Sequence, residues 1–137
     1  HHAIRIFPEV KDVLQRLRAS KINLAIASNI PSDFLREHLQ RFKIDEFFKV
    51  VTGQDDCQEQ KPSPEPILVT LRKLKADPNF SAYVGDMEED IIAGKRANVI
   101  TIAICRERGY HPCWKLRRQK PNFIISNLRD LIQIVNK

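Results

Sequence analysis

Short apolar runs alternate with amphipathic stretches along this chain. Each run is bounded by polar residues, glycine or proline, which is typical of buried strands. Between the runs, apolar residues recur at helical spacing, which predicts helices with one buried face. Strands are therefore predicted at 22–27, 48–52, 82–84, 99–104 and 123–125. Helices are predicted from 10 to near 19–21, from 31–33 to 42, and at 67–74, 90–97 and 128–135.

The alternation of strands and helices predicts an α/β fold, namely a three-layer, Rossmann-like parallel sheet with helices on both faces. In such sheets, ligands bind at the carboxyl ends of the strands. Ser28 and Asn29 follow one predicted strand, and Asp86 follows another. Lys61 precedes the proline-rich segment 62–66, which stiffens a loop that we expect to open on the same edge. Hydroxyl, amide, ammonium and carboxylate groups are thus expected to lie together at one edge of the sheet.

Two carboxylates lie where a predicted strand ends and the next predicted helix begins. Gly85 and Asp86 end an apolar run, and Asp90 follows about one helical turn later. Two facing carboxylates repel each other unless a hard cation such as Mg²⁺ lies between them, so Asp86 and Asp90 are candidate metal ligands. The alternative is that an acidic first turn merely complements the helix dipole. The segment taken alone leaves both interpretations open.

The combination of groups at this edge suits a phosphoryl group. Ser28 could donate to a phosphoryl oxygen, and Lys61 could neutralise phosphate charge, including charge that develops in a transition state. Each residue also has a simpler explanation, because a lone serine often caps the next helix and most lysines lie at the surface. The three features in this chain order are a rarer pattern than any one of them.

The order of these motifs resembles the haloacid dehalogenase-like (HAD) superfamily, in its phosphoglycolate-phosphatase-like branch. That family has an apolar strand ending in Ser or Thr, then a Lys often followed by Pro, then a Gly-Asp motif with a second Asp. By this resemblance, Ser28 and Asn29 bind phosphoryl oxygens, and Ser28 and Lys61 take part in catalysis. Asp86 and Asp90 hold Mg²⁺, Asp90 directly or through water. The Gly-Asp form favours phosphate-ester hydrolysis over dehalogenation.

One part of the family pattern is absent from these 137 residues. The family's nucleophile is the first Asp of a DxDx[TV] motif, and no such motif occurs here. In the family fold, its strand lies mid-sheet, between the strands that end at Ser28 and Asp86. The resemblance therefore implies an incomplete sheet, no helical cap, and half of a Mg²⁺ site with weak or absent metal binding. We expect this chain alone to have no phosphatase turnover.

The sequence is compatible with two functions. The first is the core fragment of a Mg²⁺-dependent HAD-like phosphatase, acting on a small phosphorylated metabolite or phosphate. The alternative is a non-catalytic HAD-like binding or regulatory subunit that another chain completes. In either case, we expect self-association or a complementing N-terminal segment. A receiver domain fits less well, because its acidic residues precede the Ser/Thr and the Lys.

Composition is ordinary for a globular protein, with 42% apolar and 29% charged residues, and we expect one domain over 1–137. The run His1-His2 is typical of a tag remnant, and Met87 is the sole methionine, so we expect a processed or cloned fragment. No membrane span or signal peptide is evident, and we expect a cytoplasmic protein. Three cysteines without CxxC spacing argue against a disulfide framework or a zinc ribbon.

The net charge of +6 favours anionic partners. Cationic residues gather between positions 106 and 120, together with Tyr110 and Trp114. Such a mixture suits single-stranded nucleic acid, but acidic, glycine and proline residues interrupt it and it matches no nucleic-acid-binding motif. We therefore predict a solvated loop in this segment and no nucleic-acid partner.

Overall fold

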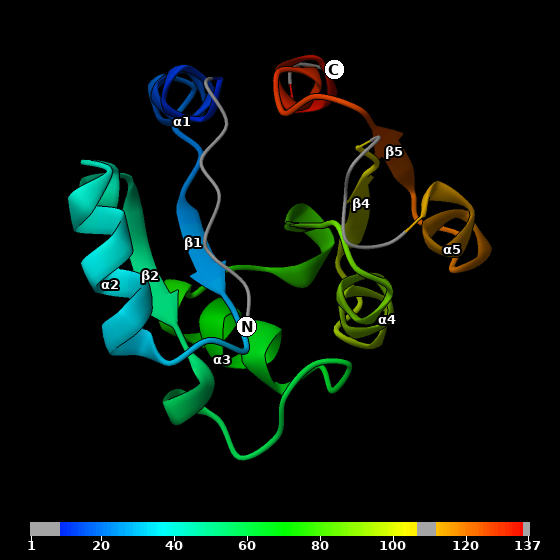
Figure 1. Ribbon diagram of the computed structural model, residues 1–137, viewed down its shortest axis with the longest axis horizontal. Coiled ribbons are helices and arrows are strands. Elements are labelled where there is room, and N and C mark those ends of the chain that lie inside the picture. Colours follow the sequence, from blue (N-terminus) through cyan, green and yellow to red (C-terminus); the bar gives the residue numbers. More distant parts are fainter. Residues whose placement is uncertain (1–8, 107–111, 136–137) are drawn as a thin grey trace.

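Parallel strands form the middle layer of the computed structural model, which describes residues 9–106 and 112–135 (Figure 1). The strands are β1 (Leu24–Ala27), β2 (Phe48–Thr52), β3 (Ala82–Gly85), β4 (Ile100–Ile104) and β5 (Phe123–Ile125). Each lies within about two residues of a predicted strand, because short apolar runs bounded by polar residues fit a layer buried on both faces. The predicted fold class is confirmed.

Helices cover both faces of the strands. They are α1 (Val10–Ala19), α2 (Ser32–Arg41), α3 (Glu65–Leu74), α4 (Glu88–Arg96), α5 (Cys113–Arg118) and α6 (Asp130–Val135), with the 3₁₀ turns η1 (Asp45–Phe47), η2 (Gln54–Asp56) and η3 (Pro78–Phe80). Alternate strand residues face opposite helical layers. Leu24 and Ile26 pack with residues of α1 and α2, whereas Ala27 packs against α3 and α4. Residues 1–8, which include His1 and His2, lie outside the described part.

The strands form two half-sheets. β1 pairs with β2, and β3 pairs with β4 and then β5, all in parallel register. No backbone ladder joins β1 to β3, so the two half-sheets stand apart in Figure 1. The interruption lies between the strands that end at Ser28 and Asp86, where the family resemblance places the missing strand.

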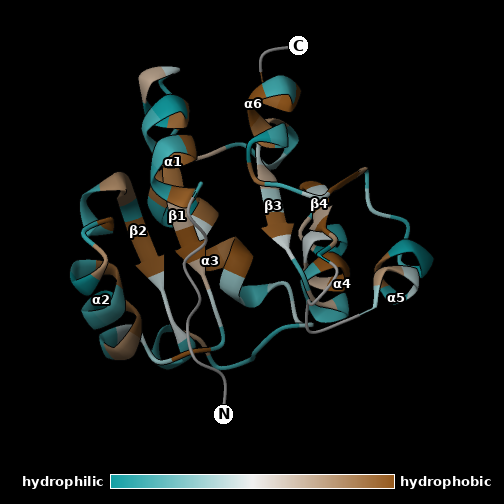
Figure 2. Cartoon of the chain, turned by 45° about the horizontal axis from the view of Figure 1, so that its top comes forward, coloured by the Kyte–Doolittle hydropathy of each residue, from teal (hydrophilic) through white to brown (hydrophobic). Residues whose placement is uncertain are grey.

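Packing across this interruption holds the halves together. On one face, Val13 and Leu17 of α1 share a buried cluster with Ile102 of β4 and Leu131 of α6. In Figure 2, β1, β2 and β3 are largely brown, and the helices α1 and α6 carry both brown and teal segments. Among residues 9–106 and 112–135, no helix has the length and apolar character that crossing a membrane requires.

Two features of the segment after β4 differ from expectation. The basic stretch, predicted to be a loop, contains the short helix α5, which buries Leu116 against Ile91 and Ala103. Cys105 and Cys113 form a disulfide that ties the end of β4 to the start of α5. The sequence did not predict this disulfide, because three cysteines without CxxC spacing argue against a disulfide framework. Disulfides are rare in reducing compartments, so the pair lends no support to the cytoplasmic expectation.

Candidate functional site

The carboxyl ends of β1 and β3 carry the predicted site residues. Ser28 and Asn29 come directly after β1, and Asp86 comes directly after β3. The arrowheads of β1, β2 and β3 point to the same side of the molecule in Figure 2. The connection from β2 to α3, which contains Lys61, joins these strand ends through the contacts described next.

Asn29 fixes the backbone of Lys61. Its Oδ1 accepts a hydrogen bond from the Lys61 backbone N–H at 3.0 Å, and its Nδ2 donates to the Lys61 carbonyl oxygen at 3.4 Å. This two-point contact joins residues 32 positions apart in the chain. The prediction that the Lys61 loop opens on the edge where β1 ends is therefore confirmed. Asn29 as a direct phosphate ligand stays a prediction.

The Lys61 side chain is buried in a polar cluster. Its Nζ donates to Asp90 Oδ1 at 2.6 Å and to the Tyr83 hydroxyl oxygen at 2.9 Å. The side chains of Lys61 and Asp90 are only 11% and 7% exposed. Burial, the largest effect, disfavours the ammonium, but Tyr83 and Asp90 together outweigh it and raise the pKa of Lys61 above its ordinary value. Lys61 is therefore a fixed positive charge rather than a surface lysine.

Asp90 contacts both the start of α4 and the Lys61 side chain. Its Oδ2 accepts a hydrogen bond from the backbone N–H of Met87 at 3.1 Å, which caps the first turn of α4. Its Oδ1 accepts from Lys61. The carboxylate therefore serves both the helix terminus and the buried ion pair.

Tyr83 also belongs to the site, although it is not among the residues predicted from the sequence. Its hydroxyl accepts from Lys61 and donates to the carbonyl oxygen of Ala27 at 2.6 Å. Burial, the largest effect, raises the pKa of Tyr83 to about 12, while the Lys61 ammonium opposes the shift. The available signal was a tyrosine within an apolar strand, because a buried hydroxyl has to find a partner.

Ser28 does not cap the next helix. Its Oγ accepts a hydrogen bond from the Ile30 backbone N–H at 3.1 Å, which leaves its own O–H to donate elsewhere. The next helix, α2, begins at Ser32, whose backbone N–H and hydroxyl both donate to the Asp55 carboxylate. These bonds from Ser32 lower the pKa of Asp55. The helix-cap explanation of Ser28 is thus excluded, and its contact with phosphate stays a prediction.

Carboxylates are the candidate donors of the predicted Mg²⁺ site. Mg²⁺ commonly takes one or two protein carboxylates, with water and phosphate oxygens completing its shell. Asp86 at the end of β3 is such a carboxylate. Among the described residues, no group of three or more His, Cys, Asp or Glu side chains could hold a metal ion. The donor set fits an ion shared with a phosphate group or a further segment.

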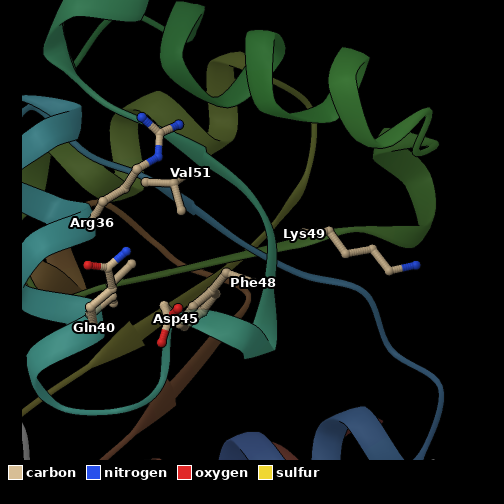
Figure 3. A pocket seen from close by; sticks show the side chains of 7 residues that line it. Arg36, Gln40, Asp45, Phe48, Lys49 and Val51 are labelled. Atoms are coloured by element: carbon tan, nitrogen blue, oxygen red, sulfur yellow. The ribbon is translucent and has the colours of Figure 1, made fainter.

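A separate pocket lies on the outer side of the β1–β2 half-sheet. Its volume is about 230 Å³, and Figure 3 shows side chains of α2, η1 and β2 around it. Its lining residues are Arg36, Leu39, Gln40, Asp45, Phe48, Lys49 and Val51. None of the predicted site residues contributes to it, so pocket size alone does not locate the Lys61 cluster.

Known proteins share both this fold and this sequence pattern. The model of the haloacid dehalogenase-like hydrolase family matches residues 1–104. Pyrophosphatase PpaX of Oceanobacillus iheyensis is 34% identical over 135 residues, which are 96% of this chain and 61% of that protein. A phosphoglycolate phosphatase of Salmonella paratyphi A is 34% identical over 127 residues, which are 93% of this chain and 50% of that protein.

Solved structures agree with these sequence matches. A predicted phosphoglycolate phosphatase from Haemophilus somnus superposes with a TM-score of 0.85 and 28% identity, covering 96% of this chain and 57% of that one. A HAD phosphatase from Thermococcus onnurineus gives a TM-score of 0.82 and 26% identity, covering 96% and 58%. The chain belongs to the haloacid dehalogenase-like hydrolase family, and it spans about half to three fifths of the length of these relatives.

Proposed function

We propose that this chain is the phosphate-binding part of the core of a Mg²⁺-dependent HAD-like phosphatase. The observation that carries the proposal is the Lys61 ammonium, held by Asp90 and Tyr83 beside the end of β1. A buried, fully charged lysine at this edge is suited to bind a dianionic phosphate ester. The substrate class is a small phosphorylated metabolite, the class to which phosphoglycolate belongs.

In this proposal, each residue acts on a phosphoryl oxygen or on a neighbour. Ser28 donates its O–H to one oxygen, and Lys61 donates an N–H that Asp90 and Tyr83 do not use. Asn29 keeps the Lys61 backbone in place. Asp86 would hold Mg²⁺, supported by Asp90 directly or through water, and the ion would neutralise phosphate charge.

Turnover needs a nucleophile that this chain does not contain. No DxDx[TV] motif occurs in the 137 residues, and the β1 and β3 edges that would flank its strand are not paired with each other. We therefore propose that a segment carrying this motif completes the sheet. A non-catalytic subunit completed by another chain shares the open edges. The two functions differ in whether the completing segment contains the DxD aspartate.

Phosphate binding tests the first part of the proposal. Orthophosphate is titrated into the ¹⁵N-labelled chain with and without Mg²⁺, and amide shifts are followed by NMR. We expect saturable shifts at residues 28–30, and their loss in Lys61→Met. The control is Lys11→Met, which removes an exposed lysine of α1 and should leave binding unchanged. Equal binding by wild type and Lys61→Met would refute the assignment of Lys61.

Turnover tests the second part. We expect no Mg²⁺-dependent hydrolysis of p-nitrophenyl phosphate by the purified chain. We expect activity after co-expression with the segment that precedes residue 1 in the parent reading frame, provided that it encodes DxDx[TV]. Robust hydrolysis by the 137-residue chain alone would overturn the proposal. A preceding segment without the motif would favour the non-catalytic subunit.

A further inference from the structure

Tyr83 stands at a junction between the two half-sheets. It lies on β3, and its hydroxyl donates to the carbonyl oxygen of Ala27 on β1 at 2.6 Å. No backbone ladder joins these two strands. The hydroxyl therefore makes a direct polar bond across the interval where backbone pairing is missing.

The direction of each hydrogen bond in this cluster is determined by chemistry. The Ala27 carbonyl can only accept, so the single Tyr83 O–H proton is committed to it. The Lys61 ammonium can only donate, so it uses a lone pair of the Tyr83 oxygen at 2.9 Å. The Asp90 carboxylate accepts a hydrogen bond from a second Lys61 N–H, with an N···O distance of 2.6 Å. Lys61 is thus held from two sides, by a residue of β3 and a residue of α4.

We propose that Tyr83 is a positioning residue for Lys61, which it orients by linking the ammonium to the β1 backbone. This inference rests on the proposed role of Lys61 in binding phosphate, and it assigns Tyr83 no contact with the substrate. With Asp90 as its only partner, the ammonium could rotate about a single hydrogen bond. The second bond, to a hydroxyl anchored on Ala27, leaves a single arrangement in which a third N–H remains for a ligand.

The variant Tyr83→Phe removes the hydroxyl and keeps the ring. Lysine acylation followed by mass spectrometry reports how accessible and how well paired each amine is. We expect Lys61 in Tyr83→Phe to react about fivefold faster than in the wild type, the factor expected for one net hydrogen bond. Other lysines serve as internal references and should keep their rates. We also expect orthophosphate affinity to fall severalfold.

Thr70→Val is the matched control. Thr70 is buried, and its hydroxyl donates to the Pro66 carbonyl oxygen and accepts from the Thr52 hydroxyl, both at 2.7 Å. The substitution therefore removes a buried hydroxyl outside the Lys61 cluster. We expect both Thr70→Val and Tyr83→Phe to lower the melting temperature, because each removes a buried hydroxyl, but Thr70→Val should leave the Lys61 reaction rate at the wild-type value.

Each outcome has one interpretation. An unchanged Lys61 rate in Tyr83→Phe, or a uniform rise at all lysines, would overturn the positioning role. A wild-type chain that binds no orthophosphate would refute the proposed function, while the Lys61 rate would still decide the role of Tyr83. If Tyr83→Phe does not fold, Lys61→Met tests the same bond from the other side. It should shift the Tyr83 ζ-carbon resonance, and the absence of a shift would overturn the inference.

Discussion

At the residue scale, Gly85 leaves no room for a side chain. A Cβ built at this position would collide with the Asp90 side chain, whose carboxylate binds both Lys61 and the start of α4. The glycine is required because a strand end and a helix start approach each other here. Its φ is not in the left-handed region, so the constraint is one of space rather than of backbone conformation.

Gly85→Ala is expected to destabilise the protein by about 1 to 3 kcal/mol, because the added methyl must displace Asp90 from two hydrogen bonds. Urea unfolding followed by circular dichroism measures the change. The control is Ala82→Gly at the exposed start of the same strand, expected to cost under about 1 kcal/mol. An unchanged unfolding midpoint in Gly85→Ala would show that Asp90 can move without loss.

The raised pKa of Tyr83 makes the stability of the folded protein depend on pH in the alkaline range. Its pKa is about 12 in the folded chain, against an ordinary value of 10.0. The folded state therefore holds the phenolic proton more tightly than the unfolded state. The resulting stabilisation is complete below about pH 10 and is lost as the pH rises toward 12. The raised pKa of Lys61 acts in the same direction.

We expect the free energy of unfolding to fall by about 2 kcal/mol between about pH 9 and about pH 12 because of Tyr83. Urea titrations at a series of pH values measure this slope. Tyr83→Phe lacks the phenol and should show a shallower decline than the wild type. Parallel declines for the two proteins would show that Tyr83 titrates with an ordinary pKa.

The site was predictable in part from residue types and order. Ser28, Lys61 and the Gly85-Asp86 turn were selected because groups at strand ends meet at one edge. Chain spacing could not indicate that Tyr83 bonds to Ala27, which lies 56 positions away. It also could not show that Asp90 serves the helix and the lysine at once, because those partners come from different loops.

At the element scale, strands and long helices followed the hydrophobic pattern, and α5 did not. This helix has six residues and buries only Leu116, so it gives no periodic signal. It is held by contacts from elsewhere in the chain. Arg118 makes a two-bond ion pair with Glu88 of α4, and Gln119 donates to the same carboxylate.

The disulfide between Cys105 and Cys113 also fixes α5 to β4. It closes a loop of eight positions, for which chain entropy predicts a stabilisation of about 2 to 3 kcal/mol. We expect reduction to lower the free energy of unfolding by about that amount. Thiol titration of the unfolded protein should find one thiol, from Cys57, before reduction and three afterwards.

The control for the disulfide is Cys57→Ser, which should leave the reduction-dependent loss of stability unchanged. It should also leave no titratable thiol before reduction. Three thiols in unreduced protein would contradict the disulfide.

At the scale of the whole molecule, the interruption between β1 and β3 dominates. Backbone groups of a strand point alternately to its two sides, and Ser28 N–H donates to Thr52 O of β2. The N–H and C=O groups of Ala25 and Ala27 therefore point toward β3. The Ala27 carbonyl does so visibly, since it accepts from Tyr83. Among residues 9–106 and 112–135, no strand pairs with this inner edge, and an edge without a partner is a template for another strand.

We expect the 137-residue chain to self-associate through this inner edge when no completing segment is present. Light scattering over a concentration series should show a mass that rises with concentration. Ala25→Pro removes an inner-edge N–H and should shift the chain toward the monomer.

The matched control is Lys49→Pro on β2. Val50 and Thr52 are the residues of β2 whose backbone groups face β1, so Lys49 lies at the outer edge. Loss of association in Lys49→Pro alone would place the contact at the outer edge. A monomer at every concentration, without a second peptide by mass spectrometry, would mean that the halves need no strand between them, because α1, α6 and Tyr83 suffice to join them.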